Sequence, residues 1–230
     1  MFVAQPAQAA IDLSSVTLST TTVVLDGDAG CGNRVNVTVK VFVPTAEQEN
    51  LFSVTSTAVA PNGDSVDFLL MNQKSRSGDY ATYGDSVYLC GFDAPGRYRL
   101  DTEVVWWDDA ISGTRQEDNS QTFYVKRPTT LTYNATPEPA KRGTNLTHKG
   151  RLMFDPFGYG KLYGPSGQTL KISFKKTGTS AYVAKGTVKT TSGGYYSKKL
   201  RTDADGTWRV EYPANNYRQT QAKGDYVDTK

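Results

Sequence analysis

The chain has 230 residues, of which 37% are hydrophobic and 11% aromatic, which is enough for two modest cores and excludes global disorder. One β-sandwich needs roughly 100 residues, so this length predicts two domains. The net charge of +3 conceals an asymmetry: residues 1–127 hold 9 Lys and Arg against 16 Asp and Glu, a net of −7, whereas residues 128–230 hold 17 against 7, a net of +10. Such asymmetry concerns partners and solubility rather than fold.

Residues 1–10 resemble the end of a secretory leader. Ala7-Gln8-Ala9, followed by Ala10, has the small-x-small pattern of a signal-peptidase site. The segment lacks a basic region and is shorter than a full signal peptide, so we expect a leader remnant and a mature protein that begins near Ala10. No apolar run approaches the roughly 18 residues of a membrane helix, so no membrane span is expected.

Residues 11–127 are predicted to form an acidic, immunoglobulin-like β-sandwich. Short runs of alternating apolar and polar residues are separated by Gly, Pro, Asn and Asp turns, as is typical of this fold. Val35, Val37 and Val39 alternate with polar residues and predict a strand with one buried face. The expected strands are Val16–Leu25, Arg34–Val43, Phe52–Val59, Ser65–Met71, Ser86–Cys90, Arg97–Trp107 and Gln121–Lys126.

Two local features of this half predict how the sandwich is tied together. Gly96 and Tyr98 open a strand in a way that resembles the tyrosine corner of immunoglobulin-like domains. Cys31 and Cys90 form a disulfide if the chain is secreted and remain buried thiols if it is cytosolic, and the leader-like start favours the disulfide. Because Leu100 stands where the antibody pattern has a cysteine, we expect the bond to tie an end of the sandwich. It would close a loop of about 60 residues, worth roughly 4 kcal/mol.

Residues 128–230 are predicted to form a second, basic sandwich of the same class. The boundary falls near Pro128, where a strand-like run meets a proline, and no helix with an apolar stripe follows. The two halves should therefore fold independently as tandem immunoglobulin-like domains. The expected strands are Thr130–Tyr133, Asn145–Phe154, Gln168–Lys175, Ala181–Thr190, Tyr195–Thr202, Thr207–Tyr212 and Asp225–Asp228, with Trp208 in the corner position.

Several segments of this second half are similar to one family. Pro128–Ala140, Gly167–Thr190 and Gly224–Asp228 resemble small secreted actinobacterial proteins with tandem immunoglobulin-like domains, and residues 130–139 and 175–182 carry most of the match. The resemblance covers the second domain almost end to end and implies secretion and fold rather than an activity, although some members are labelled calcium-binding. The segment Leu152–Gly167 departs from the family pattern, so no ligand preference is carried over to that loop.

The sequence offers few candidates for catalysis or metal binding. His148 is the only histidine, which excludes a metal cluster of several histidines, and we expect it to be an ordinary surface residue. Asp26–Gly30 and Asp203–Gly206 begin like Asp-x-Asp loops, but neither continues as an EF-hand. We expect turn-forming aspartates and no cofactor, with a weak calcium site as the alternative. A catalytic pair of carboxylates that lie far apart in the sequence stays an alternative, because such a pair has no local motif.

Cations recur at alternate, outward positions along the second-domain strands and are expected to cover the solvent side of one sandwich. Such a surface either keeps the domain soluble or binds an anionic polymer, and cell-wall phosphate suits an exported protein better than nucleic acid does. The seven candidate polymer-binding residues are Lys171, Lys175, Lys185, Lys189, Lys199, Arg201 and Arg209.

Aromatic residues gather in a Gly- and Pro-containing loop of the second domain. Phe157, Tyr159 and Tyr163 are candidates for contact with a sugar or a protein partner, and the alternative is that they cap the end of the core. Phe154, Tyr195 and Tyr196 belong to the same group of aromatics.

These observations predict a secreted, non-enzymatic binding or structural module that acts at the bacterial surface or in the extracellular space. Its expected partner is an anionic cell-wall polymer or an extracellular protein. The alternative is an extracellular enzyme, an inhibitor or a calcium-dependent binding protein with its activity in the loops. The sequence leaves the ligand and the oligomeric state open.

Overall fold

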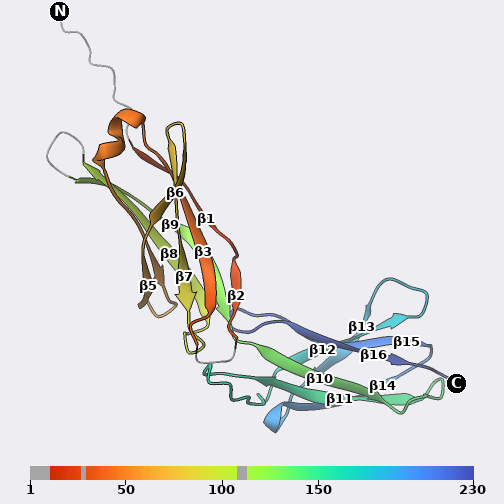
Figure 1. Cartoon of the computed structure of the whole chain (residues 1–230). Coiled ribbons are helices and arrows are strands. Elements are labelled where there is room, and N and C mark those ends of the chain that lie inside the picture. Colours follow the sequence, from red (N-terminus) through yellow and green to blue (C-terminus); the bar gives the residue numbers. More distant parts are fainter. Residues whose placement is uncertain (1–10, 27–29, 108–112) are drawn as a thin grey trace, which may run out of the picture. The chain divides into compact units, whose positions relative to one another are not determined.

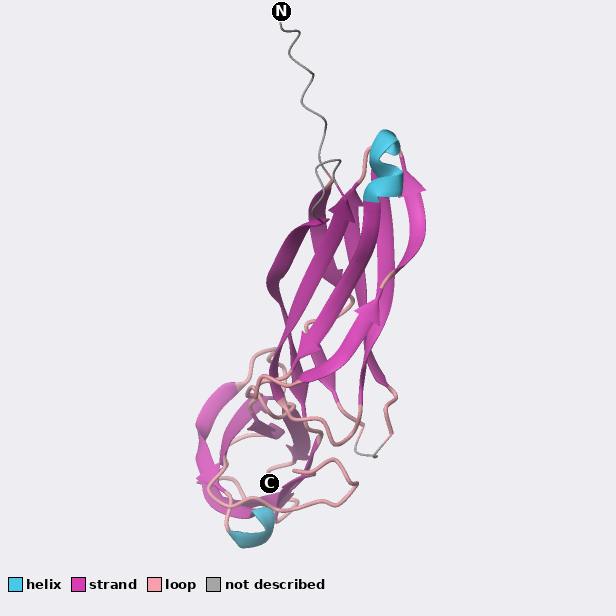
Figure 2. Cartoon of the chain, turned by 90° about the vertical axis from the view of Figure 1, so that its left-hand side faces the viewer, coloured by secondary structure: helices cyan, strands magenta, loops and turns pink. Residues whose placement is uncertain are grey.

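A computed structural model describes residues 11–26, 30–107 and 113–230. The leader-like segment 1–10 therefore lies outside the described residues. The chain divides into two compact units: the second takes in Lys126–Lys230 with the short segments Val24–Gly30 and Gly91–Asp93, and the first takes in the remainder. Strands dominate both units (Figure 2). Within the described part of the chain, no helix is long and apolar enough to cross a membrane.

The first unit is a sandwich of a four-stranded sheet, β1-β3-β7-β6, and a five-stranded sheet, β2-β9-β8-β4-β5 (Figure 1). A short helical turn, η1 (Thr45–Asn50), precedes β4. The strands are β1 (Asp12–Leu18), β2 (Thr22–Val24), β3 (Asn33–Phe42), β4 (Leu51–Val59), β5 (Ser65–Leu70), β6 (Asn72–Ser77), β7 (Tyr80–Leu89), β8 (Gly96–Trp107) and β9 (Gly113–Lys126).

The core of the first unit follows the predicted alternation. Val35, Val37 and Val39 of β3 are at most 1% exposed, so β3 buries one face as expected. Tyr98 is fully buried, and its hydroxyl donates to the carbonyl oxygen of Ala94 at 2.8 Å. This hydrogen bond confirms the predicted tyrosine corner.

The disulfide between Cys31 and Cys90 is present, as predicted. Cys31 lies just before β3 and Cys90 directly follows β7, and the neighbouring residues Asn33 and Leu89 are partners in the β3–β7 register. The bond therefore ties the ends of two paired strands at one end of the sandwich.

Three strand predictions in this unit were wrong in extent. The expected run Val16–Leu25 is broken into β1 and β2, and Ser86–Cys90 and Gln121–Lys126 are only the end segments of the longer β7 and β9. The strand β6 was not expected at all, because Asn72–Ser77 is polar on both faces. It pairs with β7 at the edge of its sheet, where a strand needs no buried face.

The second unit is a sandwich of a three-stranded sheet, β10-β11-β14, and a four-stranded sheet, β13-β12-β15-β16 (Figure 1). Together with the first unit it confirms an all-β chain of two tandem immunoglobulin-like sandwiches. A turn, η2 (Ser192–Gly194), links β13 to β14. The strands are β10 (Thr129–Thr136), β11 (Asn145–Phe154), β12 (Thr169–Lys176), β13 (Val183–Lys189), β14 (Tyr195–Arg201), β15 (Gly206–Tyr212) and β16 (Gln221–Val227).

His148 lies in the core of this unit, so the prediction of a surface residue was wrong. It is fully buried, its Nδ1 lies 2.8 Å from the Tyr133 hydroxyl oxygen, and its ring centroid lies 4.4 Å from that of Trp208. The reason is the alternation of β11, in which Leu146, His148 and Leu152 all face inward. Burial lowers the pKa of His148 to about 4, so the imidazole is neutral at pH 7.

Candidate functional site

A groove of about 720 Å³ opens on the three-stranded sheet of the second unit. Residues of β10, β11 and β14 form most of it, and residues at and after the end of β13 complete it. We call it the basic groove, and it is lined by Thr132, Tyr133, Asn134, Lys149, Gly150, Arg151, Lys189, Thr191, Tyr195, Tyr196 and Ser197.

The absence of a side chain at Gly150 shapes this groove. Gly150 is the register partner of both Tyr133 and Tyr196, so it lies between two tyrosines on adjacent strands. A Cβ at this position would lie 2.0 Å from the Thr132 carbonyl oxygen and 2.5 Å from the Tyr196 hydroxyl oxygen. Tyr196 uses this space to donate a 2.6 Å hydrogen bond to the Thr132 carbonyl oxygen. The tyrosine thereby links β14 to β10 across the middle strand.

The charged residues among those lining the groove are all cations: Lys149, Arg151 and Lys189. Arg151 is held in place, because its Nε donates to the Gly193 carbonyl oxygen at 2.8 Å and its Cζ lies 4.7 Å from the Tyr195 ring centroid. Tyr195 itself is 55% exposed. The groove thus combines a positioned guanidinium, two lysines and an exposed aromatic ring, a combination suited to an anionic ligand.

The seven predicted cations do not share one face, and that prediction was wrong. Lys199 and Arg201 lie on β14 and belong to the three-stranded sheet, whereas Lys171, Lys175 and Arg209 lie on the four-stranded sheet. Alternation along a strand indicates which side faces solvent, but it does not indicate to which sheet of a sandwich the strand belongs.

Lys185 is displaced from the others by a bulge in the β12–β13 pairing. The register shifts between Ile172 and Ser173, and Lys185 falls within the shift. Its Nζ lies 5.8 Å from the ring centroid of Phe174, which packs against the core. Lys185 therefore lies over a core-facing ring, whereas Lys171 is exposed on the outer side of its strand.

Two of the predicted cations on the four-stranded sheet, Lys175 and Arg209, lie beside one aromatic ring, and Arg209 also pairs with a carboxylate. Lys175 Nζ and Arg209 Cζ lie 5.3 Å and 4.3 Å from the centroid of Tyr182. Arg209 also forms a 2.9 Å ion pair with Glu211, which is the register partner of Lys171. The nearby carboxylate reduces the positive charge of this face, so it is a weaker candidate for an anion site than the basic groove.

Two residues of the basic groove, Lys149 and Arg151, were not predicted from the sequence. They occupy outward positions of β11, opposite Ser197 and Tyr195 of β14. The same alternation that buries Leu146 and Leu152 leaves Lys149 and Arg151 unburied on the outer side of β11. The sequence therefore contained a signal for both cations. Of the predicted cations, only Lys189 lines the groove.

The predicted aromatic loop is held together by the carboxylate of Asp155. Asp155 is 1% exposed, and its oxygens accept hydrogen bonds from the backbone N–H groups of Phe157 at 3.0 Å, Gly158 at 2.9 Å and Gly160 at 2.5 Å. A carboxylate that accepts hydrogen bonds from several backbone N–H groups restricts the chain around it, so the loop has a defined conformation.

The rings of this loop are exposed and do not cap the core. Phe157 is 57% exposed, Tyr159 69% and Tyr163 40%, whereas Phe154 at the start of the loop is buried. Phe157 and Tyr163 contact each other edge to face, with centroids 5.9 Å apart. The loop therefore presents a small aromatic surface, and its role as a contact site stays a prediction.

Across the described segments, no group of three or more His, Cys, Asp or Glu side chains is placed to hold a metal ion. In the second Asp-x-Asp loop, Asp203 pairs with Arg201 at 2.8 Å. Asp205 accepts hydrogen bonds from the backbone N–H and the hydroxyl of Thr229, which lower its pKa. The first such loop, Asp26–Gly30, falls partly outside the described residues.

No known protein family matches the sequence, and no curated protein matches it. Among solved structures, a tetra-tandem repeat in the extending region of a large adhesion protein is 13% identical, with a TM-score of 0.34, over 95% of this chain and 50% of that one. A DUF4785 family protein from Legionella pneumophila is 10% identical, with a TM-score of 0.42, over 93% of this chain and 56% of that one. The fibronectin(III)-like modules of Clostridium thermocellum CbhA are 12% identical, with a TM-score of 0.34, over 94% and 95%.

This chain thus spans about half the length of the first two of these structures. At such identities and scores the likenesses say nothing about activity, and the fold assignment rests on the sheets themselves.

Proposed function

We propose that this chain is a secreted, non-enzymatic binding module and that its second unit binds an anionic extracellular polymer in the basic groove. The observation that carries this proposal is the lining of the groove, in which the described residues include three cations and an exposed tyrosine but no carboxylate. A phosphate-bearing cell-wall polymer is the ligand class that such a groove fits in the extracellular space.

The disulfide supports the proposed location. Disulfides persist in secreted and surface proteins and are rare in the reducing cytosol, and Cys31 and Cys90 are the only cysteines of the chain.

The test compares two variants of the full chain that lose the same number of cations. The groove variant carries Lys149→Ser, Arg151→Ser and Lys189→Ser, and the control variant carries Lys171→Ser, Lys175→Ser and Lys185→Ser on the other sheet. Binding to poly(glycerol phosphate) is measured by titration calorimetry, with neutral dextran as the uncharged probe. Circular dichroism and thermal melting confirm that each variant is folded.

We expect the groove variant to bind poly(glycerol phosphate) about tenfold more weakly than the parent, because three lost charge contacts of roughly 0.5 kcal/mol each sum to about 1.5 kcal/mol. The control variant should bind within about threefold of the parent. Equal losses in the two variants would show that only net charge matters and would refute the groove as the site. A double variant, Lys149→Ser with Lys189→Ser, retains Arg151 and its contact with Tyr195 in case the triple variant is unstable.

A further inference from the structure

The outer face of the three-stranded sheet β10-β11-β14 continues beyond the basic groove. Burial alternates along each strand, so every second residue points away from the core. No aspartate or glutamate occurs among the outward residues of these three strands, all of which the structure describes. Four outward residues are cations, and the others are threonine, serine, asparagine, methionine and tyrosine. The outward cations are Lys149, Arg151, Lys199 and Arg201.

Three of these cations lie in consecutive rows across the sheet. Arg151 and Lys149 are successive outward residues of β11. Lys199 of β14 is the register partner of Thr147, which is the next outward residue of β11. Successive outward residues of an antiparallel strand lie about 7 Å apart. The sheet therefore carries one cation in each of three rows, and we call Arg151, Lys149 and Lys199 the cationic track.

The charges of the cationic track have no carboxylate partner in the part of the chain that the structure describes. Lys149 and Lys199 are exposed. Arg151 donates from Nε to the Gly193 carbonyl oxygen, and its terminal nitrogens have no hydrogen-bond partner among the described residues. Neither of these nitrogens is buried. A guanidinium that is fixed at Nε presents its remaining donors to a phosphate in a constant geometry.

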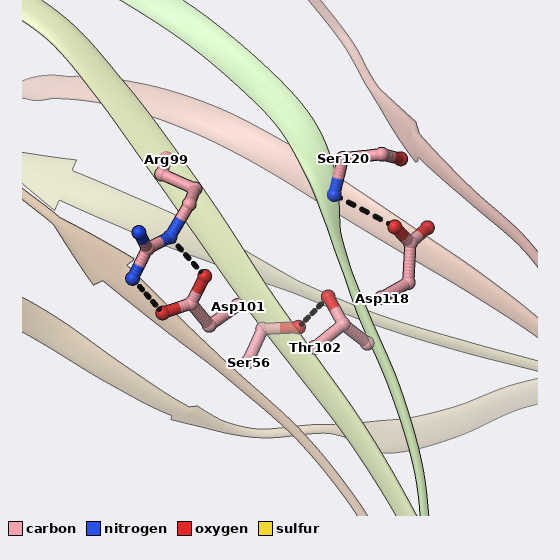
Figure 3. A network of polar contacts seen from close by, with 6 residues as sticks. All are labelled: Ser56, Arg99, Asp101, Thr102, Asp118 and Ser120. Carbon is pink, nitrogen blue, oxygen red and sulfur yellow. Dashed lines mark hydrogen bonds and ion pairs between the residues drawn. The ribbon is translucent and has the colours of Figure 1, made fainter.

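Two other outward arginines are already neutralised by a carboxylate of the chain. In the first unit, Nε and a terminal nitrogen of Arg99 bind the two carboxylate oxygens of Asp101 at 2.5 Å and 2.7 Å (Figure 3). Arg201 lies in the next row of the three-stranded sheet after Lys199 and pairs with Asp203 at 2.8 Å. The cationic track therefore ends before Arg201, and its charges stay available to a ligand.

We propose that a linear polyphosphodiester lies along the cationic track, with consecutive phosphates at Arg151, Lys149 and Lys199. The argument is charge complementarity at a regular interval, because one cation per row faces a polymer with one phosphate per short repeat unit, such as glycerol phosphate. The basic groove, which holds Arg151, Lys149 and Lys189, is then one end of a longer site. This inference rests on the proposed function and adds the direction of the polymer and the shortest ligand that fills the site.

The uncharged outward residues of this sheet favour a polyol phosphate over a single-stranded nucleic acid. Threonine, serine and asparagine side chains donate and accept hydrogen bonds, as the hydroxyl groups of a polyol require. Among the outward residues of these described strands, Tyr195 is the one aromatic, and Arg151 already lies over its ring. Single-stranded nucleic acids are held by aromatic rings on which successive bases stack, and this face offers one such ring at most.

The test uses the full chain and oligomers of glycerol phosphate from one to about six units, at about 20 mM salt, where screening is weak. NMR titration of the labelled chain gives the affinity for each oligomer. The track variant carries Lys199→Ser, and a second variant, Lys199→Arg, retains the charge. The matched control is Lys171→Ser, which removes an exposed lysine from the other sheet. Thermal melting confirms that each variant is folded.

We expect the affinity of the parent to rise about two- to threefold with each added unit up to the third, because each phosphate gains one charge contact until the track is filled. Longer oligomers should gain little more. Lys199→Ser should leave the affinity for one unit unchanged and lower that for three or more units by about two- to threefold. It should also reduce the slope of log affinity against log salt by about 0.7, the effect of one lost phosphate contact on a flexible chain. Lys199→Arg and Lys171→Ser should bind as the parent does.

An affinity that does not increase beyond one unit would overturn the track. So would a Lys199→Ser variant that binds long oligomers as well as Lys171→Ser does. Both results would leave the proposed function intact, because that function is tested separately by the groove variant. Absence of any binding by the parent, to the oligomers and to poly(glycerol phosphate), would refute the proposed function and this inference together. Tighter binding of an oligothymidylate with the same number of phosphates would also overturn the proposal, because it would identify the face as a nucleic-acid site.

Discussion

Asp155 is the residue on which the aromatic loop depends. Replacing it with alanine removes an acceptor for three backbone N–H groups, two of them in the tight Gly158–Gly160 segment. We predict that Asp155→Ala lowers the free energy of unfolding by about 2–3 kcal/mol, measured by urea denaturation. Asp203→Ala, which removes only an exposed ion pair, should cost less than about 1 kcal/mol. Similar losses in the two variants would contradict this role.

His148 is predicted to make stability fall as the solution is acidified. Its pKa is about 4 in the folded chain, because burial disfavours the charged form more strongly than Asp225 favours it, against about 6.5 when unfolded. The unfolded state therefore takes up the proton first. The ionisation of His148 does not affect the free energy of unfolding above about pH 6.5. As the pH falls towards 4, it lowers the free energy of unfolding by up to about 3 kcal/mol.

The measurement compares urea unfolding of the parent and of His148→Asn at pH 7 and near pH 4.5. Because His148 is the only histidine, its replacement should remove this part of the pH dependence and leave that of the carboxylates. Identical pH dependence in the two proteins would contradict a buried, neutral His148.

The sequence predicts single residues well where one pattern decides their place. The alternation of Val35, Val37 and Val39 and the corner at Tyr98 required only local information. His148 was misjudged because a buried polar residue is stable only with a partner, here Tyr133 on the neighbouring strand β10. That partnership depends on strand pairing, which a single strand does not reveal.

Gly150 is the position in β11 on which both the sheet and the basic groove depend. Gly150→Ala would place a Cβ against the Thr132 carbonyl oxygen, a backbone atom, and against the Tyr196 hydroxyl. We predict a loss of about 2–3 kcal/mol in stability and separation of β10 from β11. The measurement is urea unfolding together with amide hydrogen exchange of Leu131 and Tyr133. A control, Gly178→Ala, lies in an open turn at positive φ and should cost only about 1 kcal/mol.

At the scale of strands, the sequence predicted most elements but not their assembly. Asn145–Phe154 was expected with the bounds that β11 has, because its pattern is clean and its ends are marked by turns. The sheet to which β14 belongs could not be predicted, and this is why Lys199 was grouped with Lys171. The basic groove was missed for the same reason, since it forms only where β10, β11 and β14 lie side by side.

At the scale of the whole molecule, we predict that residues 129–230 fold without the first half. The core cluster of the second unit runs from Leu131 to Val227, so every member lies within this fragment. A fragment with its own complete core should retain cooperative unfolding. Well-dispersed amide signals in a two-dimensional NMR spectrum would agree with this prediction, and a collapsed spectrum would contradict it.

Chemical-shift mapping tests whether the second unit binds an anionic polymer in the basic groove. The labelled full-length chain is titrated with poly(glycerol phosphate) while its amide signals are followed. We predict that the largest changes fall on the groove strands, at Thr132, Lys149, Arg151 and Ser197. Changes centred instead on the outer face of the four-stranded sheet, around Lys171, or on the aromatic loop around Tyr159, would show that the basic groove is not the binding site.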